Sequence, residues 1–563
     1  MIDAFSLYHL VKELNTTLKG AKINRVSQPD KDDVYLLTHS FSGNRTLVLS
    51  SNAENCRIAF TAEEKPNPKT AFGFCMLLRK HLLGAVIESV ELVGFERIVK
   101  LTFTGRNDFK ESVKKVLYAE IMGKYSNLIL TENGIILGCL KNAPLDVATT
   151  RVTLSGVEYK LPKPQDKIEL TDKNSAISRL SAFSGQDLAQ FFFNNVKGFA
   201  YPTAVEASER CKDFSSIEDL YNKLYNFIYN TELKPNIAGE GKLKDVYVTD
   251  YKTISGEKIF FESALYAYDD FYTNKEREKS FNLKKKSLLD KVNGLIKKLC
   301  KKLQAESEKI LACKDAEELK IKGELITANI YRLKEGMESC ELENWYDDYK
   351  IVKITLDKQL SPSKNAQRYF KKYTKEKRTL EIIIPQKEQT EKELSYLYTV
   401  QLFINQATKL SDFTDLEEEL ISIGLLPKPK FKQKSISESQ YRMFYLDGYV
   451  IKCGKNNVQN DRLTQRAFWG DLWLHTKNYH SAHVIIETKG DAIPNKIIEV
   501  ASEICAYYSD ASSGSKVPVD YCLKKFVKKP PQAKPGSVIY TDYKTCYVNP
   551  NPHNELLSTI KND

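Results

Sequence analysis

The hydrophobic pattern of the first 160 residues or so predicts a mixture of helices and strands. Residues 1–15 and 71–83 have the apolar spacing that is typical of helices. Strands are predicted at residues 86–93, 97–104, 116–122 and 128–130, with a turn at Asn133-Gly134 after the last of them. The segment Pro162-Lys163-Pro164 then marks a linker, so the pattern indicates a first domain of mixed composition.

Residues from about 172 to 235 have a helical pattern, and one stretch within them suggests contact with phosphate. Two short apolar helices are predicted within residues 180–193, on either side of Gly185. This arrangement resembles a helix-hairpin-helix, in which the backbone amides of the turn meet a phosphate group. The Gly-x-Gly turn that usually accompanies it is absent, so an ordinary helical turn is the alternative interpretation.

A helical pattern with one apolar seam extends from about residue 274 to 336. The seam consists of residues spaced by three and four positions: Leu288, Val292, Leu295, Leu299 and Leu303. A helix rises about 1.5 Å per residue, so some 60 residues predict an arm roughly 90 Å long. A short strand is expected at residues 350–356 before the chain returns.

A second long helix is predicted to begin at Ser361-Pro362, an N-cap followed by a first-turn proline. It is expected to extend to about residue 413, and Pro385 should kink or break it. Its apolar seam contains Leu394, Leu397, Val400 and Ile404. Two helices of similar length with facing seams predict an antiparallel coiled-coil hairpin.

The last domain is expected to begin near Ile436 with strands at 441–446 and 449–453, joined by an Asp447-Gly448 hairpin turn. The fold class is therefore predicted as α+β and multidomain. The expected domains are a mixed α/β domain (1–172), a helical domain with the helix-hairpin-helix (173–270), a long antiparallel coiled-coil arm (271–430), and an α+β C-terminal domain (431–563).

Composition changes this picture mainly through charge. The chain has 563 residues and a formal net charge of +11, and its lysines are clustered. Clustered positive charge favours an anionic partner, and nucleic acid is favoured over membrane because no amphipathic membrane segment stands out. Eleven scattered cysteines without a CxxC pair argue against a zinc finger or redox pair. With no signal peptide and no apolar run of about 18 residues, we expect a cytoplasmic protein.

The stretch at residues 360–378 carries both cations and aromatic rings. Its cations are Lys364, Arg368, Lys371, Lys372, Lys375, Lys377 and Arg378, with Glu376 as the acidic residue. Tyr369, Phe370 and Tyr373 are interleaved with them. Cations neutralise phosphates and rings stack on bases, so this stretch predicts RNA contact near the tip of the arm. The alternative is a solvated helix face whose three aromatic residues point into the core.

Other candidate motifs give weaker indications of chemistry. His475, His480 and His483 lie close together, but no nearby carboxylate or thiolate completes a metal site, and packing of His475 in a loop is favoured. The segment Gly454-Lys455-Asn456-Asn457 lacks the spacing of a phosphate-binding loop, and a polar loop that touches RNA is the preferred interpretation. No GxSxG, HExxH or kinase motif occurs. We therefore predict no catalytic residues, no metal and no cofactor.

Several ordered blocks resemble the NFACT family, in particular its bacterial RqcH branch. The blocks are FCMLLRKHL at 74–82, YAEIMGKYSNLIL at 118–130, LSPSKNAQRYFKKYTKEK at 360–377, GKNNVQNDRLT at 454–464 and DLWLHTK at 471–477. The final segment from Val517, VPVDYCLKKFVKKPPQAKPGSVIYTDYKT, also resembles that family. The resemblance covers essentially the whole chain. It implies an NFACT-N domain with a fold similar to formamidopyrimidine-DNA glycosylases and a C-terminal NFACT-R RNA-binding domain.

The resemblance also implies a function. Such a protein would bind large (50S) ribosomal subunits obstructed by peptidyl-tRNA, through 23S rRNA and ribosomal proteins, and would recruit alanyl-tRNA. It would direct template-free alanine tailing of the stalled chain, which marks that chain for degradation. It would not be an enzyme, because the ribosome performs peptidyl transfer. A small RNA-binding tailing cofactor of the RqcP type is a further expected partner, and no membrane is expected.

The resemblance assigns site residues by matching motifs. The residues implied in tRNA binding and tailing are Glu96, Arg97, Glu120, Ile121, Met122, Lys124 and Asn127. The residues implied in rRNA binding are Arg368, Lys371, Lys372, Lys375, Lys455, Asn456 and Asn457. Glu96 stands where the family has Asp. The alternatives are a surface ion pair on a strand for Glu96-Arg97 and a core position for Ile121 and Met122.

Two other functions compete with this interpretation. A fibronectin-binding surface adhesin is one, since part of the family is named for that activity, but it would require unconventional export. A DNA glycosylase is the other, because of the fold expected for the N-terminal domain. Those enzymes use an N-terminal proline amine as nucleophile, and Ile2 follows Met1 here.

Overall fold

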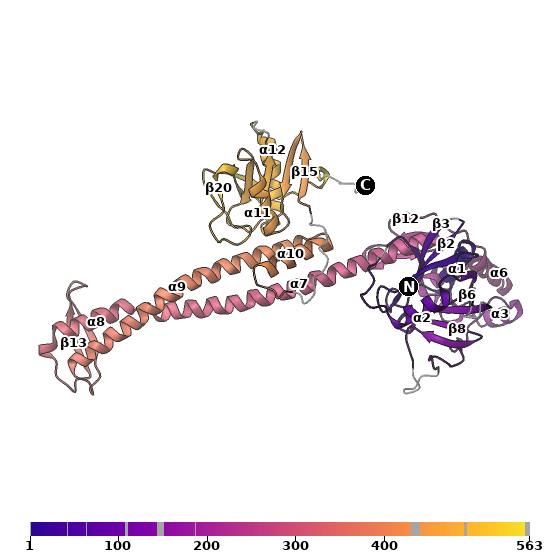
Figure 1. Cartoon of the computed structure of the whole chain (residues 1–563), viewed down its shortest axis with the longest axis horizontal. Coiled ribbons are helices and arrows are strands. Elements are labelled where there is room, and N and C mark those ends of the chain that lie inside the picture. The colour runs from indigo at the N-terminus through magenta and orange to yellow at the C-terminus, as the bar shows by residue number, and fades with distance from the viewer. Residues whose placement is uncertain are drawn as a thin grey trace. The chain divides into compact units, whose positions relative to one another are not determined.

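The computed structural model describes residues 2–41, 43–63, 65–106, 111–143, 151–185, 187–428, 440–488 and 492–557. The chain divides into two compact units, Met1–Glu278 and Lys279–Asp563. Each unit combines helices with antiparallel sheets (Figure 1), in agreement with the predicted α+β class.

A nine-stranded antiparallel sheet forms the base of the first unit, in the order β4-β3-β2-β1-β5-β6-β7-β8-β9. Its strands are β1 (Lys22–Ser27), β2 (Asp33–Ser40), β3 (Gly43–Ser50), β4 (Arg57–Thr61), β5 (Val86–Leu92), β6 (Ile98–Arg106), β7 (Ser112–Glu120), β8 (Asn127–Glu132) and β9 (Ile135–Cys139). Helices α1 (Ala4–Leu18) and α2 (Gly73–Leu82) pack against it. The four predicted strands are confirmed as β5 to β8, whereas the pattern had not singled out β1 to β4.

Turn chemistry explains how this sheet is threaded. Asn133 and Gly134 join β8 to β9 with φ angles of 50° and 81°. Both values lie in the left-handed region, which asparagine and glycine adopt more readily than other residues. The predicted turn at this position is therefore confirmed.

Four helices and a small sheet complete the first unit. The helices are α3 (Lys173–Leu180), α4 (Leu188–Asn195), α5 (Tyr201–Cys211) and α6 (Ile217–Tyr229), and the strands are β10 (Asn236–Ala238), β11 (Asp245–Tyr247) and β12 (Lys258–Phe260). They share one hydrophobic core with the large sheet. Asp3 links the two parts of this unit. Its carboxylate accepts from the amide of Ser6 and so caps α1, and it also accepts from the Ala200 amide and the Thr203 hydroxyl. Gly185 lies between α3 and α4 with a φ of 88°, but α3 ends at Leu180, so the helix expected just before Gly185 within residues 180–193 is not present there.

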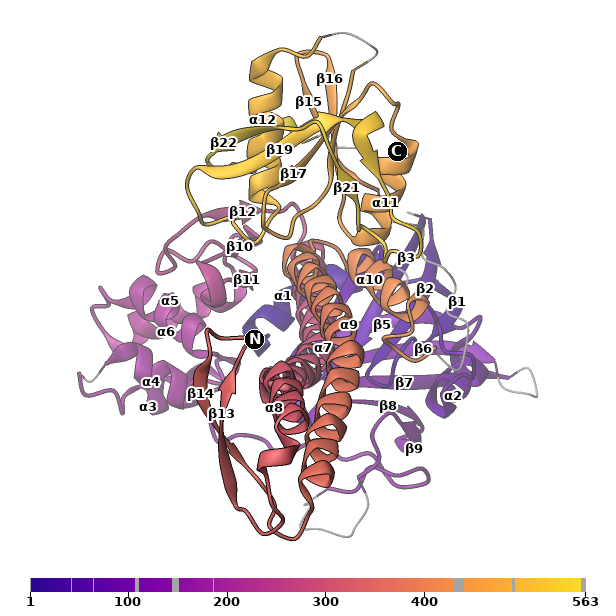
Figure 2. The same ribbon diagram turned by 90° about the vertical axis from the view of Figure 1, so that its left-hand side faces the viewer.

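The second unit contains a long helical arm. Its elements are the later part of α7 (Ala264–Ala312), then α8 (Ala316–Ala328), β13 (Ser339–Asn344), β14 (Lys350–Thr355), α9 (Pro362–Gln406) and α10 (Leu410–Ser422). Side chains of α7 and α9 meet in antiparallel order, with Lys285 bonded to the Asn405 carbonyl and Gln401 to Asn293. Of the predicted seams, one buried cluster contains Leu288, Val292, Leu397, Val400 and Ile404, and Leu295 and Leu299 pack against it. Leu303 and Leu394 are not part of this cluster. Figure 2 shows α7 and α9 side by side.

The boundaries of the arm helices correct three predictions. Helix α7 begins ten residues earlier than expected and ends at Ala312, where a short turn leads into α8. Helix α9 ends at Gln406, so residues 410–413 belong to a separate helix. Helix α9 also continues through Pro385 without a break. Pro385 and Glu381 are exposed, so water reaches the carbonyl that has lost its helical donor.

The C-terminal domain is built on a six-stranded antiparallel sheet in the order β15-β16-β18-β17-β19-β22. Its elements are β15 (Arg442–Leu446), β16 (Tyr449–Cys453), α11 (Asn457–Arg466), β17 (Leu472–Thr476), β18 (Val484–Glu487), α12 (Asn495–Tyr507), β19 (Val517–Leu523), β20 (Val527–Lys528), β21 (Ile539–Tyr540) and β22 (Lys544–Val548). The predicted Asp447-Gly448 hairpin is confirmed, while the expected start at Ile436 lies outside the described residues. The domain shares a hydrophobic cluster with α7, α9 and α10, so it is docked on the arm.

Candidate nucleic-acid interface

Glu96 and Arg97 lie in the turn between β5 and β6, where Arg97 had been expected to begin the strand. Gly94 and Phe95 have positive φ angles of 52° and 49°, which reverses the chain tightly before these residues. The Glu96 carboxylate lies 3.2 Å from the ammonium of Lys197, which precedes α5. Arg97 is half-buried. The turn therefore presents one guanidinium and one carboxylate at the boundary between the sheet and the helices.

The second predicted block lies directly beside this turn. The amide of Ile121 donates to the carbonyl of Arg97 at 2.8 Å, continuing the pairing of β6 with β7. Ile121 is 2% exposed and belongs to the core, as the alternative interpretation held. Two sequence blocks more than twenty residues apart are thus brought together at one end of the sheet.

Glu120 lies inside the protein instead of on its surface. Arg151 donates two hydrogen bonds to its carboxylate, at 3.0 and 2.5 Å, and the Tyr159 hydroxyl donates a third at 2.9 Å. The carboxylate side chain is 4% exposed. Burial, followed by the charge of Glu120, raises the pKa of Tyr159 well above its usual value. Glu120 therefore organises the interior beneath the turn, and its carboxylate is already occupied.

Residues 122–127 divide into an exposed part and a buried part. Lys124 and Tyr125 form an exposed 3₁₀ turn, with the ammonium 4.9 Å from the centre of the Tyr125 ring. Met122 is half-buried, and its amide donates to Ser126. Asn127 is buried, and its side-chain amide forms hydrogen bonds with the backbone of residues 128 and 141. Lys124 and Tyr125 are thus the members of this block that present an exposed cation and ring.

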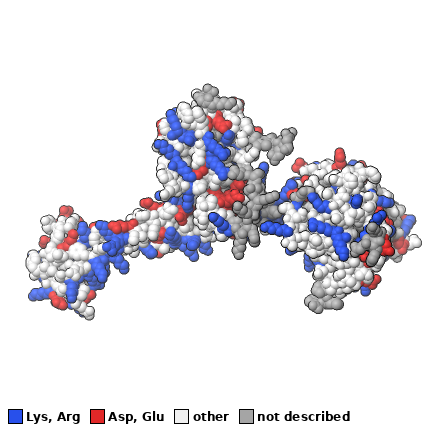
Figure 3. Space-filling view, viewed as in Figure 1, with Lys and Arg blue, Asp and Glu red and all other residues white. Residues whose placement is uncertain are grey.

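The predicted cations of the arm tip lie on the outer face of α9. Lys371, Lys372 and Lys375 are exposed, and the described residues contain no ion-pair partner for them. Arg368 is exposed as well, but it pairs with Asp357 at 3.0 Å. Figure 3 shows Lys and Arg side chains gathered near this end of the arm and over the C-terminal domain. The three lysines therefore present concentrated, uncompensated positive charge.

The aromatic residues of the same stretch face the opposite way. Tyr369 and Phe370 pack against a buried cluster formed by α8 and the β13–β14 hairpin. The hydroxyl of Tyr369 donates to the carbonyl of Thr355 at 2.7 Å, and that of Tyr373 lies 3.4 Å from Glu317. These rings hold α9 on α8, so their proposed stacking on bases is corrected in favour of the core-facing alternative.

The segment 455–457 is also interior, which corrects its interpretation as an exposed polar loop. Asn456 caps α11 by accepting from the amide of Gln459 at 2.7 Å. Asn457 is 3% exposed and donates from its backbone and side chain to the buried carboxylate of Glu419 on α10. The ammonium of Lys455 lies 3.7 Å from the Asp412 carboxylate, and burial lowers the pKa of Lys455. These groups attach the C-terminal domain to the arm.

An exposed patch that the sequence analysis did not assign to RNA lies on the C-terminal domain. Phe468 and Trp469 are 52% and 61% exposed, and their ring centroids are 5.1 Å apart. The amide of Lys525 donates to the Trp469 carbonyl, and that of Lys524 donates to the Asp471 carbonyl, so these two lysines lie beside the rings. We call Phe468, Trp469, Lys524 and Lys525 the aromatic–basic patch. Rings beside cations suit single-stranded nucleic acid.

Each of the three histidine side chains has a hydrogen-bond partner within the protein. His475 and Thr476, His480 and Asp510, and His483 and Thr464 form pairs at 2.7, 2.8 and 2.8 Å. Burial lowers the pKa of His475 to about 4 and that of His483 to about 3. Across the described ranges, no group of three or more His, Cys, Asp or Glu side chains is placed to hold a metal ion.

Comparison with known families decides where this protein belongs. Residues 3–439 match the model of the NFACT N-terminal and middle domains, and residues 440–542 match that of the NFACT protein RNA binding domain. The chain belongs to the NFACT family. Both predicted tRNA-binding blocks and the arm tip lie in the N-terminal and middle match, and the aromatic–basic patch lies in the RNA-binding match.

Two relatives of this NFACT protein span its length. It is 33% identical to the Rqc2 homolog RqcH of Bacillus subtilis (strain 168), over 98% of both chains. It is 31% identical to the Rqc2 homolog RqcH of Streptococcus pneumoniae serotype 2 (strain D39 / NCTC 7466), again over 98% of both. Among solved structures, the C-terminal part of the fibronectin/fibrinogen-binding protein from Streptococcus suis is 29% identical, with a TM-score of 0.41. It covers 50% of this chain and 100% of that chain, and at this TM-score it carries no functional argument.

No helix in the described part of this NFACT protein combines the length and the apolar character needed to cross a membrane.

Proposed function

We propose that this NFACT protein is a cytoplasmic ribosome-associated quality control factor. It binds large (50S) ribosomal subunits that carry peptidyl-tRNA and recruits alanyl-tRNA. It then directs template-free addition of alanine to the C-terminus of the stalled chain, which marks that chain for degradation. The observation that carries this proposal is the similarity to two Rqc2 homologues named RqcH. They are 33% and 31% identical to this chain over 98% of its length, which includes the RNA-binding domain.

The arrangement of cations supports a large RNA partner. The exposed lysines of α9 lie near its start, whereas the C-terminal domain contacts the same helix at Ser395. At about 1.5 Å per residue, roughly 30–36 Å of helix separates these lysines from Ser395. A ligand that meets both must be macromolecular, and phosphate contacts at two distant points would fix its orientation.

In this proposal the protein performs no bond-making itself. The ribosome supplies peptidyl transfer, and the protein supplies the entropic advantage of holding a tRNA in place. A small RNA-binding cofactor of the RqcP type is a proposed additional partner.

The turn that bears Glu96 and Arg97 is the proposed tRNA contact of the first unit. A guanidinium donates two parallel hydrogen bonds to a phosphate or a base edge, and Arg97 stands on a rigid hairpin turn suited to that geometry. Lys124 and Tyr125 extend the same region with an exposed cation and ring. The Glu96 carboxylate is paired with the buried ammonium of Lys197 beside this turn.

Purification of the tagged full chain from cells, followed by RNA sequencing, tests the proposed partners. The expected result is recovery of 23S rRNA with enriched alanine tRNA and without a matching amount of 16S rRNA. Recovery of neither large-subunit RNA nor tRNA at near-physiological salt would contradict the proposal.

A paired-variant experiment tests the tailing step. Glu96→Ala/Arg97→Ala is expected to reduce alanine tails, measured by mass spectrometry of stalled chains, while binding to large subunits largely persists. The matched control is Glu91→Ala/Lys100→Ala, which removes an exposed ion pair farther along the same two strands. Equal tailing by both variants would remove Glu96 and Arg97 from the site.

A further inference from the structure

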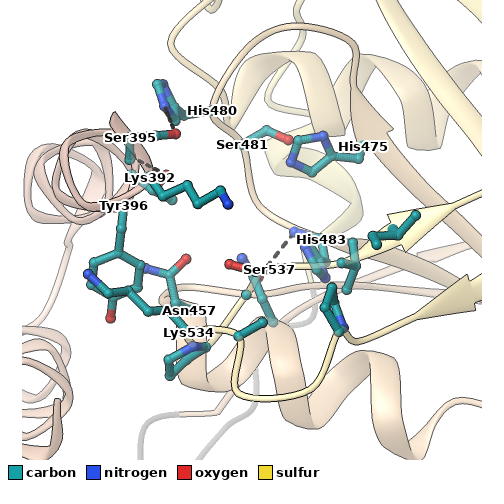
Figure 4. A pocket seen from close by; sticks show the side chains of 18 of the residues that line it. Lys392, Ser395, Tyr396, Asn457, His475, His480, Ser481, His483, Lys534 and Ser537 are labelled. Carbon is teal, nitrogen blue, oxygen red and sulfur yellow. Dashed lines mark hydrogen bonds between the residues drawn. The ribbon is translucent and has the colours of Figure 1, made fainter. Parts of the chain in front are cut away.

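A cavity of about 960 Å³ lies between α9 and the C-terminal domain, within the second unit. One wall comes from α9, with Lys392, Ser395 and Tyr396, and the opposite wall comes from the β17–β18 region and the segment 530–540. Figure 4 shows the Lys392 side chain extending from α9 toward the opposite wall. Cavities of roughly 300–1,000 Å³ are the usual size for bound small molecules and cofactors, so this one has room for a nucleotide.

The charge of the cavity favours an anionic occupant. Lys392 and Lys534 line it, and none of its described lining residues is Asp or Glu. Lys534 rests 5.0 Å from the centre of the Tyr396 ring and has no carboxylate partner within 4 Å among the described residues. Its burial lowers its pKa, and the charge of Glu393 opposes that shift. A half-buried ammonium held only by a ring is free to bind a phosphate.

Three acidic groups near the cavity are engaged in hydrogen bonds within its walls. Asp510 is bonded to His480, and Asp520 accepts from Tyr540 and Thr545. Glu419 accepts from the Tyr396 hydroxyl and from Asn457. These carboxylates therefore stabilise the walls and do not line the space itself.

The walls also offer flat rings and an acceptor. His475 stacks parallel to Trp473, with an interplanar angle of 3° and centroids 5.7 Å apart. Its Nδ1 must carry a proton, because the Thr476 carbonyl that it meets can only accept. Since burial keeps this imidazole neutral, Nε2 is left as an acceptor. Tyr479, Tyr396 and Tyr540 add further aromatic surface. Cations for phosphate, rings for stacking and an acceptor for a base edge are the chemistry of nucleotide recognition.

We propose that this cavity receives one unpaired nucleotide of the bound RNA, extruded from its stack. This inference rests on the RNA-binding role proposed above and specifies where a single base enters. Lys392 and Lys534 hold the backbone phosphate, and the His475 wall receives the base. Because the two walls belong to the arm and the C-terminal domain, the occupied cavity also fixes the docking of that domain, which His480 and Ser395 bridge at 3.0 Å.

The test uses the full chain and two fluorescein-labelled RNA hairpins that differ by one bulged, unpaired nucleotide. The parent protein is expected to bind the bulged hairpin roughly tenfold more tightly, within the range expected for one stacked base. Lys392→Ala/Lys534→Ala is expected to abolish that preference. Lys496→Ala/Lys544→Ala, which removes two exposed lysines of the same domain outside the cavity, is expected to retain it.

A filling variant separates shape from charge. Ser537→Trp places a large side chain at an exposed lining position without changing the charge, and it too is expected to lose the preference. Circular dichroism and thermal melting verify that each variant is folded.

The outcomes separate this inference from the proposed function. Equal binding of both hairpins by the parent protein would overturn the cavity assignment and leave the ribosomal role intact. A protein that binds neither the hairpins nor the large subunits would overturn both the cavity assignment and the proposed function. Competition by micromolar adenosine or uridine monophosphate would assign the cavity to free nucleotides and overturn the RNA-borne assignment.

Discussion

At the scale of single residues, Glu120 shows how the interior uses a charged group from a predicted binding block. Its carboxylate accepts from Arg151 and Tyr159 and is almost fully buried. Removing one partner from such a pair leaves the other charge buried without compensation, which is far more costly than removing both. The effect of mutating Glu120 should therefore be structural.

We predict that Glu120→Ala destabilises the sheet around β7 and β8 by about 3 kcal/mol. Arg151→Ala should have a similar effect, and the double variant should cost clearly less than the two effects added together. Hydrogen exchange of peptides from β7 and β8 measures the local free energy of opening. Unchanged exchange in Glu120→Ala, together with lost tRNA binding, would instead assign Glu120 to direct contact.

A second residue-scale prediction concerns pH and His483. This side chain is 1% exposed, and its burial lowers its pKa to about 3, whereas an unfolded histidine titrates near 6.5. The unfolded state therefore binds an extra proton below pH 6.5, and the stabilisation present above that value is lost as the pH falls. The expected slope is about 1.4 kcal/mol per pH unit for this group.

His483→Asn should reduce the parent slope by about 1.4 kcal/mol per pH unit between pH 6.5 and 4, and buried His475 should account for part of the slope that remains. Guanidinium unfolding at several pH values, followed by Trp473 fluorescence in a Trp345→Phe/Trp469→Phe background, measures it. The exposed His39→Asn variant is the control and should retain the parent slope. A parent-like slope in His483→Asn would show that other groups control the acid response.

At the scale of elements, the contact of α8 with α9 depends on a glycine. A methyl group at Gly323 would lie 3.0 Å from ring carbons of Phe370, closer than normal packing allows. Gly294 on α7 is also helical, but the space around it is open. Two glycines in helices thus differ only in what a side chain would meet.

We predict opposite effects of alanine at these two positions. Gly294→Ala should stabilise its helix by about 0.5–1 kcal/mol, because glycine costs conformational entropy. In Gly323→Ala, the same entropic gain should be outweighed by the clash of the new methyl group with Phe370. The net result should be a destabilisation of about 1 kcal/mol. Hydrogen exchange of α7 and α8 peptides is the measurement. Stabilisation by both substitutions would mean that Phe370 moves aside freely and does not fix the seam.

At the scale of the whole molecule, binding should depend on where positive charge is concentrated, because the net charge is only +11 among 563 residues. Reversing Lys371, Lys372 and Lys375 to Glu should weaken binding to large subunits. Each lost phosphate contact should reduce the slope of log affinity against log salt by roughly 0.7–0.9. Sedimentation binding at several salt concentrations measures both quantities.

The control for this prediction has the same charge change and the same spacing. Lys297, Lys298 and Lys301 are exposed on α7, and their reversal to Glu should have a smaller effect. Equal losses in both triple variants would indicate attraction by overall charge and would contradict a specific contact by α9.

Local physics explains why much of the fold followed from the sequence. Helical seams, N-caps and left-handed turn residues act over a few positions, so the turns at Asn133-Gly134 and Asp447-Gly448 and the start of α9 at Ser361-Pro362 were predictable. The juxtaposition of Arg97 with Ile121 was not predicted, because it depends on which strands pair in the folded sheet. Pro385 was another exception, because solvent at an exposed helix face tolerates a missing hydrogen bond.

The fate of individual side chains could not be predicted in this way. Whether Asn457 faced solvent or the carboxylate of Glu419 depended on how the C-terminal domain docks on α10. Whether Tyr369 met a base or the β14 backbone depended on the packing of α8.

The amino-acid sequence by itself determined the kinds of element, their order, the clustering of cations and the family resemblance, because these depend on neighbouring residues and on composition. The tertiary structure alone decided which groups remain exposed for RNA, which carboxylates are neutralised internally, and that α9 and the C-terminal domain enclose a cavity. These outcomes arise from contacts between residues far apart in the chain, and desolvation of a charged or polar group is set only when those contacts form.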